Sequence, residues 1–187
     1  EVLDAKLTGL LGMAIDPNYE TNKFIYVYYA YKLEEKLLNE EDHFIKHRVS
    51  RFAFKNNKIN NEKILLDPIL GSRDHAGGRI NFGPDKKLYI ATGDAEFDNL
   101  AQDTGYINGK ILRINADGSI PEDNPFKESP IYSIGHRNLQ GLSWDPITNS
   151  LFSSEHGQNR HDEINKIEKG KNYGWGIKRC DEVYNPT

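Results

Sequence analysis

The chain has 187 residues, with 24 lysines and arginines against 28 aspartates and glutamates, which gives a formal net charge of −4. Because both signs are interspersed and form no basic block, the composition does not indicate a nucleic-acid-binding surface. No apolar run approaches the roughly 20 residues that a membrane-spanning helix needs. The single cysteine, Cys180, excludes an internal disulfide framework and a CxxC zinc site.

The two ends of the sequence favour a piece of a longer protein. Glu1 rather than Met opens the chain, and residues 181–187 follow the patterned stretch 173–176 without a closing strand or helix. We therefore expect residues 1–187 to form a single partial domain. The alternative is a complete small domain with irregular ends.

Short apolar runs separated by turn residues predict an all-β chain. The 16 glycines and 8 prolines are spread along the whole sequence rather than gathered in a linker. Runs of strand length lie between them at 24–31, 49–54, 64–67, 88–92, 110–114, 131–134 and 151–154. Only 33–43 has a helical pattern, with Leu33, Leu37 and Leu38 on one side, and a solvated insertion is the favoured interpretation of that segment.

One hairpin pattern occurs three times. An apolar strand, a proline turn and an apolar-aromatic strand follow one another around Pro17, Pro84 and Pro146, at intervals of 67 and 62 residues. Proline fits the second position of a turn and cannot donate within a central strand, so each marks a chain reversal. The repeat predicts about three to four blades of a β-propeller, too few to close a typical ring. A β-sandwich is the alternative.

The first cluster of candidate functional side chains precedes a predicted strand. Asp74 and His75 lie in the Gly-rich segment 73–79. Loops held by a rigid sheet are common positions for catalytic residues, and a His next to an Asp can serve as a general base. The alternative is an Asp–His pair that caps the loop.

The second cluster lies between two apolar runs, at 133–141. His136, Arg137, Asn138 and Gln140 are an unusual set for a solvated turn. The permanent cation of Arg137 and the amide of Asn138 could together bind an oxygen-rich ligand. The alternative is a polar network that fixes the junction between blades.

The third cluster begins where a predicted strand ends, at 154–165. Gly157 allows the backbone to turn and to expose carbonyl oxygens, which suit a hard cation such as calcium. Asp162 and Glu163 supply negative charge nearby. An ordinary charged loop between blades is the alternative.

These clusters and the sequence between them closely resemble the soluble PQQ-dependent sugar dehydrogenases, the glucose/sorbosone dehydrogenase family, and above all its aldose sugar dehydrogenase branch. The resemblance runs from about residue 7 to residue 176. The matching stretches, in order, are GLLGMA at 9–14, DP at 16–17, DH at 74–75, GRI at 78–80, FGPD at 82–85, TGDA at 92–95, GKILRI at 109–114, DGSIP at 117–121, DNPF at 123–126, GHRNLQG at 135–141, EHG at 155–157, DEIN at 162–165 and NYGW at 172–175.

The resemblance implies a six-bladed propeller with PQQ and calcium near its axis. It implies that His75, with Asp74 beside it, takes the proton from the C1 hydroxyl of an aldose while a hydride passes to the quinone, which yields the lactone. Arg137 matches the arginine that stabilises negative charge on the quinone oxygen. An external electron acceptor and a periplasmic or secreted location are further family expectations.

The resemblance also assigns residues to the cofactor. Arg137, Asn138 and Asp162 match residues close to PQQ and its ion, and Gly157 and Gln158 occupy the positions whose backbone carbonyls bind calcium.

Two positions depart from the family pattern. Leu7 stands where a glutamine is common, and Gln158 replaces a proline. The alternative functions are a non-catalytic propeller that binds a protein or a glycan, and a structural segment of a larger surface protein.

Overall fold

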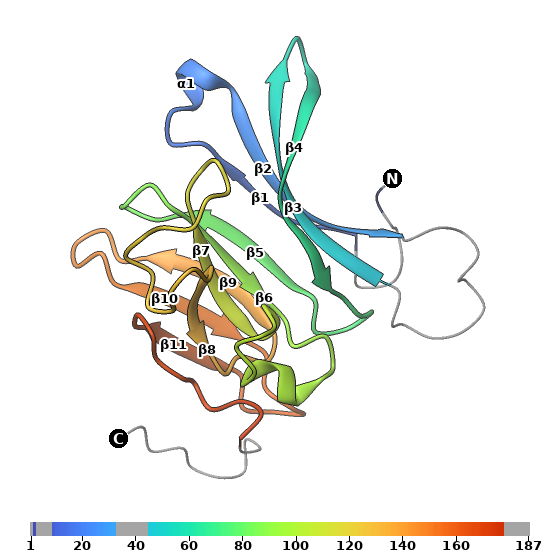
Figure 1. Ribbon diagram of the computed structural model, residues 1–187. Helices are drawn as coiled ribbons and strands as arrows, with labels where there is room; N and C mark the ends of the chain where they lie inside the picture. Colours follow the sequence, from blue (N-terminus) through green and yellow to red (C-terminus); the bar gives the residue numbers. More distant parts are fainter. Residues whose placement is uncertain (1, 3–8, 33–44, 178–187) are drawn as a thin grey trace.

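Three antiparallel sheets follow one another along the chain in the computed structural model, which describes residues 2, 9–32 and 45–177 (Figure 1). The elements in chain order are β1 (Leu10–Ile15), α1 (Tyr19–Asn22), β2 (Phe24–Lys32), β3 (Ile45–Lys55), β4 (Lys58–Leu70), β5 (Gly77–Phe82), β6 (Leu88–Thr92), η3 (Asp98–Ala101), β7 (Lys110–Ile114), β8 (Ile131–Ile134), β9 (Leu139–Trp144), β10 (Leu151–Glu155) and β11 (Glu163–Ile167). The strands pair in the orders β1-β2-β3-β4, β5-β6-β7-β8 and β9-β10-β11. The all-β prediction is confirmed.

The predicted strands coincide with observed ones, and three of them match to the residue. Segments 88–92, 110–114 and 131–134 are β6, β7 and β8. The predictions at 49–54 and 64–67 lie inside the longer β3 and β4, which form one hairpin around Asn56 and Asn57. Both asparagines have left-handed backbones, as a tight two-residue hairpin turn requires.

The threefold hairpin pattern is the opening hairpin of each sheet. It joins β1 to β2, β5 to β6 and β9 to β10, so the repeat inferred from the prolines is a repeat of the fold. Each turn has an aspartate whose side chain accepts a backbone N–H two residues further on: Asp16 from Asn18, Asp85 from Lys87 and Asp145 from Ile147. The turns are therefore closed by local hydrogen bonds.

The sheets pack face to face through their opening strands, because β1 contacts β5 and β5 contacts β9. Tyr26, Ile80 and Leu112 belong to the core between the first two sheets, and Ile111 and Leu151 to the core between the second and the third. This succession of stacked antiparallel sheets, two of four strands and one of three, is the arrangement of propeller blades.

Glycine allows the close approach of β1 and β5. A side chain on Gly12 would collide with the carbonyl oxygen of Gly78 on the facing strand. Gly78 itself has φ +99, a conformation that suits glycine, and a side chain there would meet Leu11.

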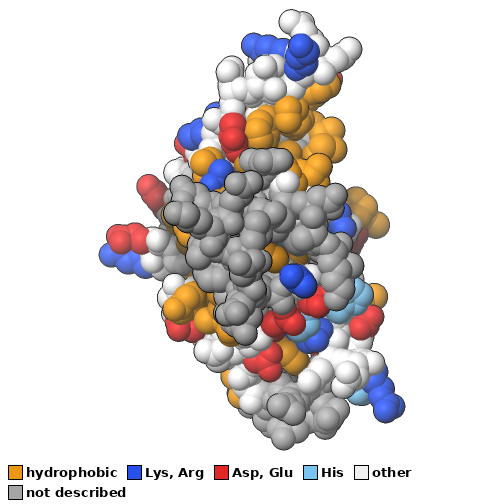
Figure 2. All heavy atoms as spheres, turned by 90° about the vertical axis from the view of Figure 1, so that its right-hand side faces the viewer, with side chains coloured by type: hydrophobic (Ala, Val, Ile, Leu, Met, Phe, Trp, Pro, Cys, Tyr) orange, Lys and Arg blue, Asp and Glu red, His pale blue; other side chains and the backbone are white. Residues whose placement is uncertain are grey.

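Some predictions lie outside the described residues. The segment 33–43, Leu7 and Cys180 are not described. The described residues include no helix with the length and apolar character to cross a membrane. Figure 2 shows hydrophobic side chains gathered toward the upper end of one face, and acidic, basic and histidine side chains together lower down.

Candidate active site

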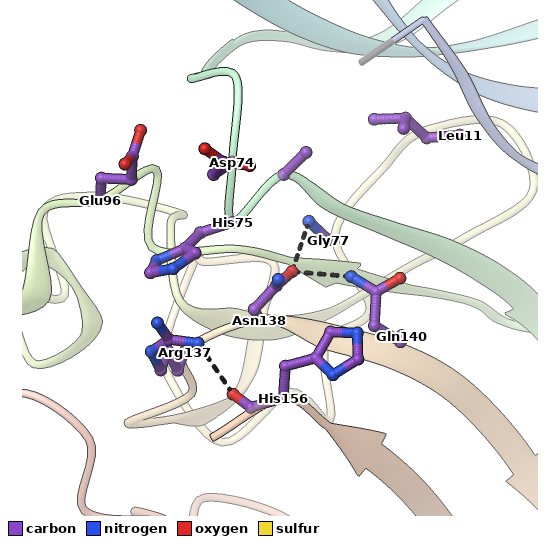
Figure 3. A pocket seen from close by; sticks show the side chains of 10 residues that line it. Leu11, Asp74, His75, Gly77, Glu96, Arg137, Asn138, Gln140 and His156 are labelled. Atoms are coloured by element: carbon purple, nitrogen blue, oxygen red, sulfur yellow. Dashed lines mark hydrogen bonds between the residues drawn. The ribbon is translucent and has the colours of Figure 1, made fainter. Parts of the chain in front are cut away.

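A pocket of about 470 Å³ lies where loops of the second and third sheets meet the opening strand of the first (Figure 3). His75 and Gly77 reach it from the start of β5, Arg137 and Asn138 from the connection between β8 and β9, and His156 from the end of β10. The volume lies in the range of small-molecule sites. The structure therefore brings together residues of all three predicted clusters.

His75 is held by a buried carboxylate. Its Nδ1 lies 2.8 Å from Oδ1 of Asp94, which is fully buried and also accepts the backbone N–H of Glu96 at 2.9 Å. With Asp94 ionised, Nδ1 must carry a proton, and the neutral ring then keeps its acceptor lone pair on Nε2. A His–Asp pair of this kind orients a general base and stabilises its protonated form.

The carboxylate that pairs with His75 thus belongs to Asp94, which follows β6 and lies 19 residues further along the chain. Asp74 lines the same pocket, and its carbonyl oxygen accepts the hydroxyl of Ser72. Gly93, just before Asp94, makes the pairing with His75 possible, because a side chain there would collide with the His75 carbonyl.

Arg137 is held by hydrogen bonds at its backbone N–H and at Nη1, whereas its buried Nε is unpaired in the described part of the chain. Nη1 donates to the carbonyl oxygens of His156 at 3.2 Å and Gly157 at 2.8 Å, and the guanidinium lies 5.2 Å from the ring centre of Trp175. The backbone N–H donates to the buried carboxylate of Glu155. Among the described residues, buried Nε has no hydrogen-bond partner. A buried donor of this kind fits a ligand with an acceptor oxygen.

A buried polar network lies behind Arg137. The two ring nitrogens of His136 lie 2.8 Å from Ser133 Oγ and 3.0 Å from Glu155 Oε2, and the ring stacks on Tyr173 at 4.7 Å. Glu155 thus joins His136 to the Arg137 backbone. The network expected as the alternative reading of this segment is present, and it supports Arg137 in the pocket wall.

Asn138 connects two sheets. Its Oδ1 accepts the backbone N–H of Gly77 at 3.2 Å and the amide of Gln140 at 2.8 Å. The loop into β5 is thereby tied to β9, next to His75. The amide nitrogen of Asn138 is the part of the side chain left to face a ligand.

The third cluster offers oxygens rather than a set of side-chain ligands. Asp162 accepts the Gly157 N–H at 3.1 Å and lies 3.4 Å from His156 Nδ1; these bonds lower the pKa of its carboxyl, the backbone bond most. Of the consecutive residues His156, Gly157 and Gln158, only His156 lines the pocket. No group of three or more His, Cys, Asp or Glu side chains within the described ranges could hold a metal.

Comparison with known proteins decides the family. A family model described as glucose/sorbosone dehydrogenase matches residues 1–187. The chain belongs to this family. The resemblance drawn from the sequence is confirmed.

Relatives with known names include both enzymes and a binding protein. The chain is 37% identical to quinoprotein glucose dehydrogenase B of Acinetobacter calcoaceticus, over 89% of this chain and 39% of that protein. It is 38% identical to the PQQ-bound aldose sugar dehydrogenase of Streptomyces coelicolor, with a TM-score of 0.82, over 93% of this chain and 50% of that structure. Human hedgehog-interacting protein is 30% identical, over 88% of this chain and 27% of its own length. The chain spans about half the length of the solved structures that it matches. It spans less than half the length of the curated relatives.

Sequence reasoning gave no role to Asp94, Glu155 or Trp175, three buried residues of this site. All three lie in stretches that carried the family resemblance, at 92–95, 155–157 and 172–175. An acidic residue two positions after the end of an apolar strand is the only local signal for Asp94. Its pairing with His75 depends on contacts between loops, which the sequence order does not show.

Proposed function

We propose that the chain forms the part of a quinoprotein aldose dehydrogenase that oxidises the sugar at C1 to the lactone, with PQQ and calcium. The observation that carries the proposal is the common pocket of His75, oriented by buried Asp94, and Arg137, whose buried Nε lacks a partner. The sugar dehydrogenases among the relatives support the same reaction class.

His75 acts as the general base in this proposal. Its Nε2 accepts the proton of the C1 hydroxyl, while Asp94 holds the ring and stabilises the imidazolium that forms. PQQ, when bound, would supply the two-electron acceptor for the hydride that leaves C1. Asp74 remains a predicted catalytic residue because it lines the same pocket.

The chain's own groups fit the cofactor and the ion. Arg137 offers the unpaired Nε, and Asn138 offers its amide, so both would hold oxygens of PQQ. The carbonyl oxygens of Gly157 and Gln158, with Asp162 nearby, have the chemistry that calcium prefers. Gly157 O also accepts from Arg137, so the residues that would hold calcium adjoin the arginine that would hold PQQ.

The second candidate function is a non-catalytic propeller that binds a protein or a glycan. The relative named hedgehog-interacting protein favours it. A pure binding module has no need of a base paired with a buried carboxylate, so we rank the enzyme first. With the enzyme we propose an external electron acceptor and a periplasmic or secreted location.

Calorimetric titration of PQQ, with and without calcium, tests the proposal on this chain and on the complete protein that contains it. Arg137→Ala should weaken binding about 10- to 100-fold, because a hydrogen bond from a charged group is lost. His75→Gln should retain PQQ binding and lower sugar oxidation with a dye acceptor by at least about 100-fold. Absence of PQQ binding by the complete protein would refute the dehydrogenase.

A further inference from the structure

Trp175 lies behind the pocket wall and is 8% exposed. Its position is fixed through the backbone: its N–H donates to Gly135 O at 3.0 Å, and its carbonyl accepts the side chain of Gln102. Gln102 also exchanges two side-chain hydrogen bonds with Asn172, at 3.1 and 2.7 Å. The ring therefore has a defined place although it follows the last strand.

The indole N–H of Trp175 donates to Asp94 Oδ2 at 2.7 Å. The other oxygen of the same carboxylate faces His75 Nδ1. Indole nitrogen is a donor only, so it cannot compete for the proton on His75 and can only hold the carboxylate. The hydrogen bond from Trp175 thereby fixes the orientation of the Asp94 carboxylate, and the carboxylate in turn orients the ring of His75.

The face of the same indole supports the Arg137 guanidinium, whose Cζ lies 5.2 Å from the ring centre. A guanidinium over a tryptophan face is held by the ring quadrupole, more strongly where water is excluded. Trp175 thus contacts both Asp94, the partner of His75, and the guanidinium of Arg137. It does not itself line the pocket.

We propose that Trp175 is a positioning residue that sets the relative placement of His75 and Arg137, the edge of its ring acting through Asp94 and the face acting on the guanidinium. The inference deepens the proposed function and rests on it for the roles of those two residues. It assigns to one side chain the alignment of the base with the cation.

The first test needs neither cofactor nor activity. The chain has two tryptophans, Trp144 and Trp175. In a Trp144→Phe background, the remaining indole N–H signal in a ¹H–¹⁵N spectrum reports on Trp175. We expect His75→Gln to move this signal, since the shared carboxylate loses a partner, whereas His161→Gln, at an exposed position, leaves it in place. A signal that ignores His75→Gln overturns the proposal.

The second test uses kinetics of the complete protein. Trp175→Phe keeps an aromatic face and removes the N–H donor together with part of the buried ring, so we expect kcat to fall by about 10- to 100-fold with the sugar KM within about threefold of the parent value. Trp144→Phe, which removes an indole packed on Tyr89, is the matched control and should leave kcat unchanged. Equal kcat in both variants, or losses that follow thermal stability alone, overturn the proposal.

The two tests distinguish failure of the proposed function from failure of the positioning role of Trp175. If the complete protein oxidises no sugar and binds no PQQ, the proposed function fails, and the indole spectra still decide whether Trp175 is coupled to His75. If the protein is active and Trp175→Phe is unaffected, only the positioning role fails.

Discussion

His47 in β3 is a buried histidine close to the loop that carries His75. It is 1% exposed, and its Nδ1 lies 3.2 Å from the hydroxyl of Tyr28, which also reaches the carbonyl of Ala76 next to His75. Burial lowers the pKa of His47 from 6.5 to about 4. The folded chain thus holds a neutral imidazole beneath the loop that leads to His75.

This pKa shift predicts a pH-dependent loss of stability. Between pH 6.5 and about 4 the unfolded chain binds a proton at His47 that the folded chain does not, so the contribution is complete above pH 6.5 and is lost on acidification. We expect up to about 3 kcal/mol from this residue. Urea unfolding of the parent and of His47→Gln at several pH values in this window measures the contribution. If the free energy of unfolding depends equally on pH in the two proteins, the assignment to His47 is wrong.

Lys110 in β7 is a second buried basic residue. Its ammonium donates to the carbonyls of Leu100 at 2.6 Å, Ala101 at 3.1 Å and Asn108 at 2.7 Å. Burial lowers the pKa of Lys110 to about 8, so the charged form with three donors still prevails at pH 7. The three donors meet three acceptors.

Replacement of Lys110 by methionine should leave these three carbonyls without their donor. We expect the free energy of unfolding to fall by about 3 kcal/mol at pH 7, because unpaired buried polar groups are costly. Lys166→Met, at an exposed position of β11, is the control and should change stability by less than about 0.5 kcal/mol. A similar small effect for both variants would show that the ammonium is dispensable.

At the residue level, the sequence predicted which side chains gather in one pocket better than which of them form hydrogen-bonded pairs. His75, Arg137 and Asn138 were expected in one site, and all three line one pocket. A carboxylate that pairs with His75 is that of Asp94, 19 residues away in the sequence. Such pairings depend on the close approach of loops, which a linear pattern cannot encode.

At the level of strands and sheets, prediction worked where apolar runs end at turn residues. β6, β7 and β8 were found to the residue, since each is wholly buried or alternates between buried and half-buried positions. β4 extends from Lys58, well before the predicted 64–67, because its first half is exposed and polar and shows no apolar pattern. Its pairing comes from the hairpin turn at Asn56 and Asn57.

The contact between β1 and β5 makes a prediction at this level. Gly12→Ala would drive a methyl group into the Gly78 carbonyl, so the two strands must separate and both the core and the pocket wall shift. We expect a loss of about 2–3 kcal/mol in the free energy of unfolding. Thermal unfolding measures it against Gly105→Ala, in an exposed turn. Equal stability of both variants would show that the sheets adapt to the methyl group.

At the scale of the whole molecule, the described part of the first sheet carries exposed apolar side chains on β1. Leu10, Met13 and Ile15 on β1 are 71, 62 and 56% exposed. Adjacent exposed apolar side chains on one strand favour association with other surfaces. This is the outward side of a stack in which the opposite side of the same sheet is packed against β5.

We therefore expect this chain to self-associate with rising concentration, and Met13→Lys to reduce the association. Ile147→Lys is the control, because Ile147 is 89% exposed but stands alone in the turn between β9 and β10. Sedimentation velocity across a concentration series makes the measurement. An equal reduction by both substitutions would point to net charge rather than to the β1 face.

The ammonium of Lys110 has a consequence for the protein's dependence on its medium. Three backbone carbonyls that converge on one positive centre form the kind of cage that many proteins fill with a monovalent ion from solution. Here the ion is covalently attached to β7 and cannot be washed out or exchanged. The loop from Asp94 to Asn108, between β6 and β7, should therefore keep its conformation in water without added potassium or sodium.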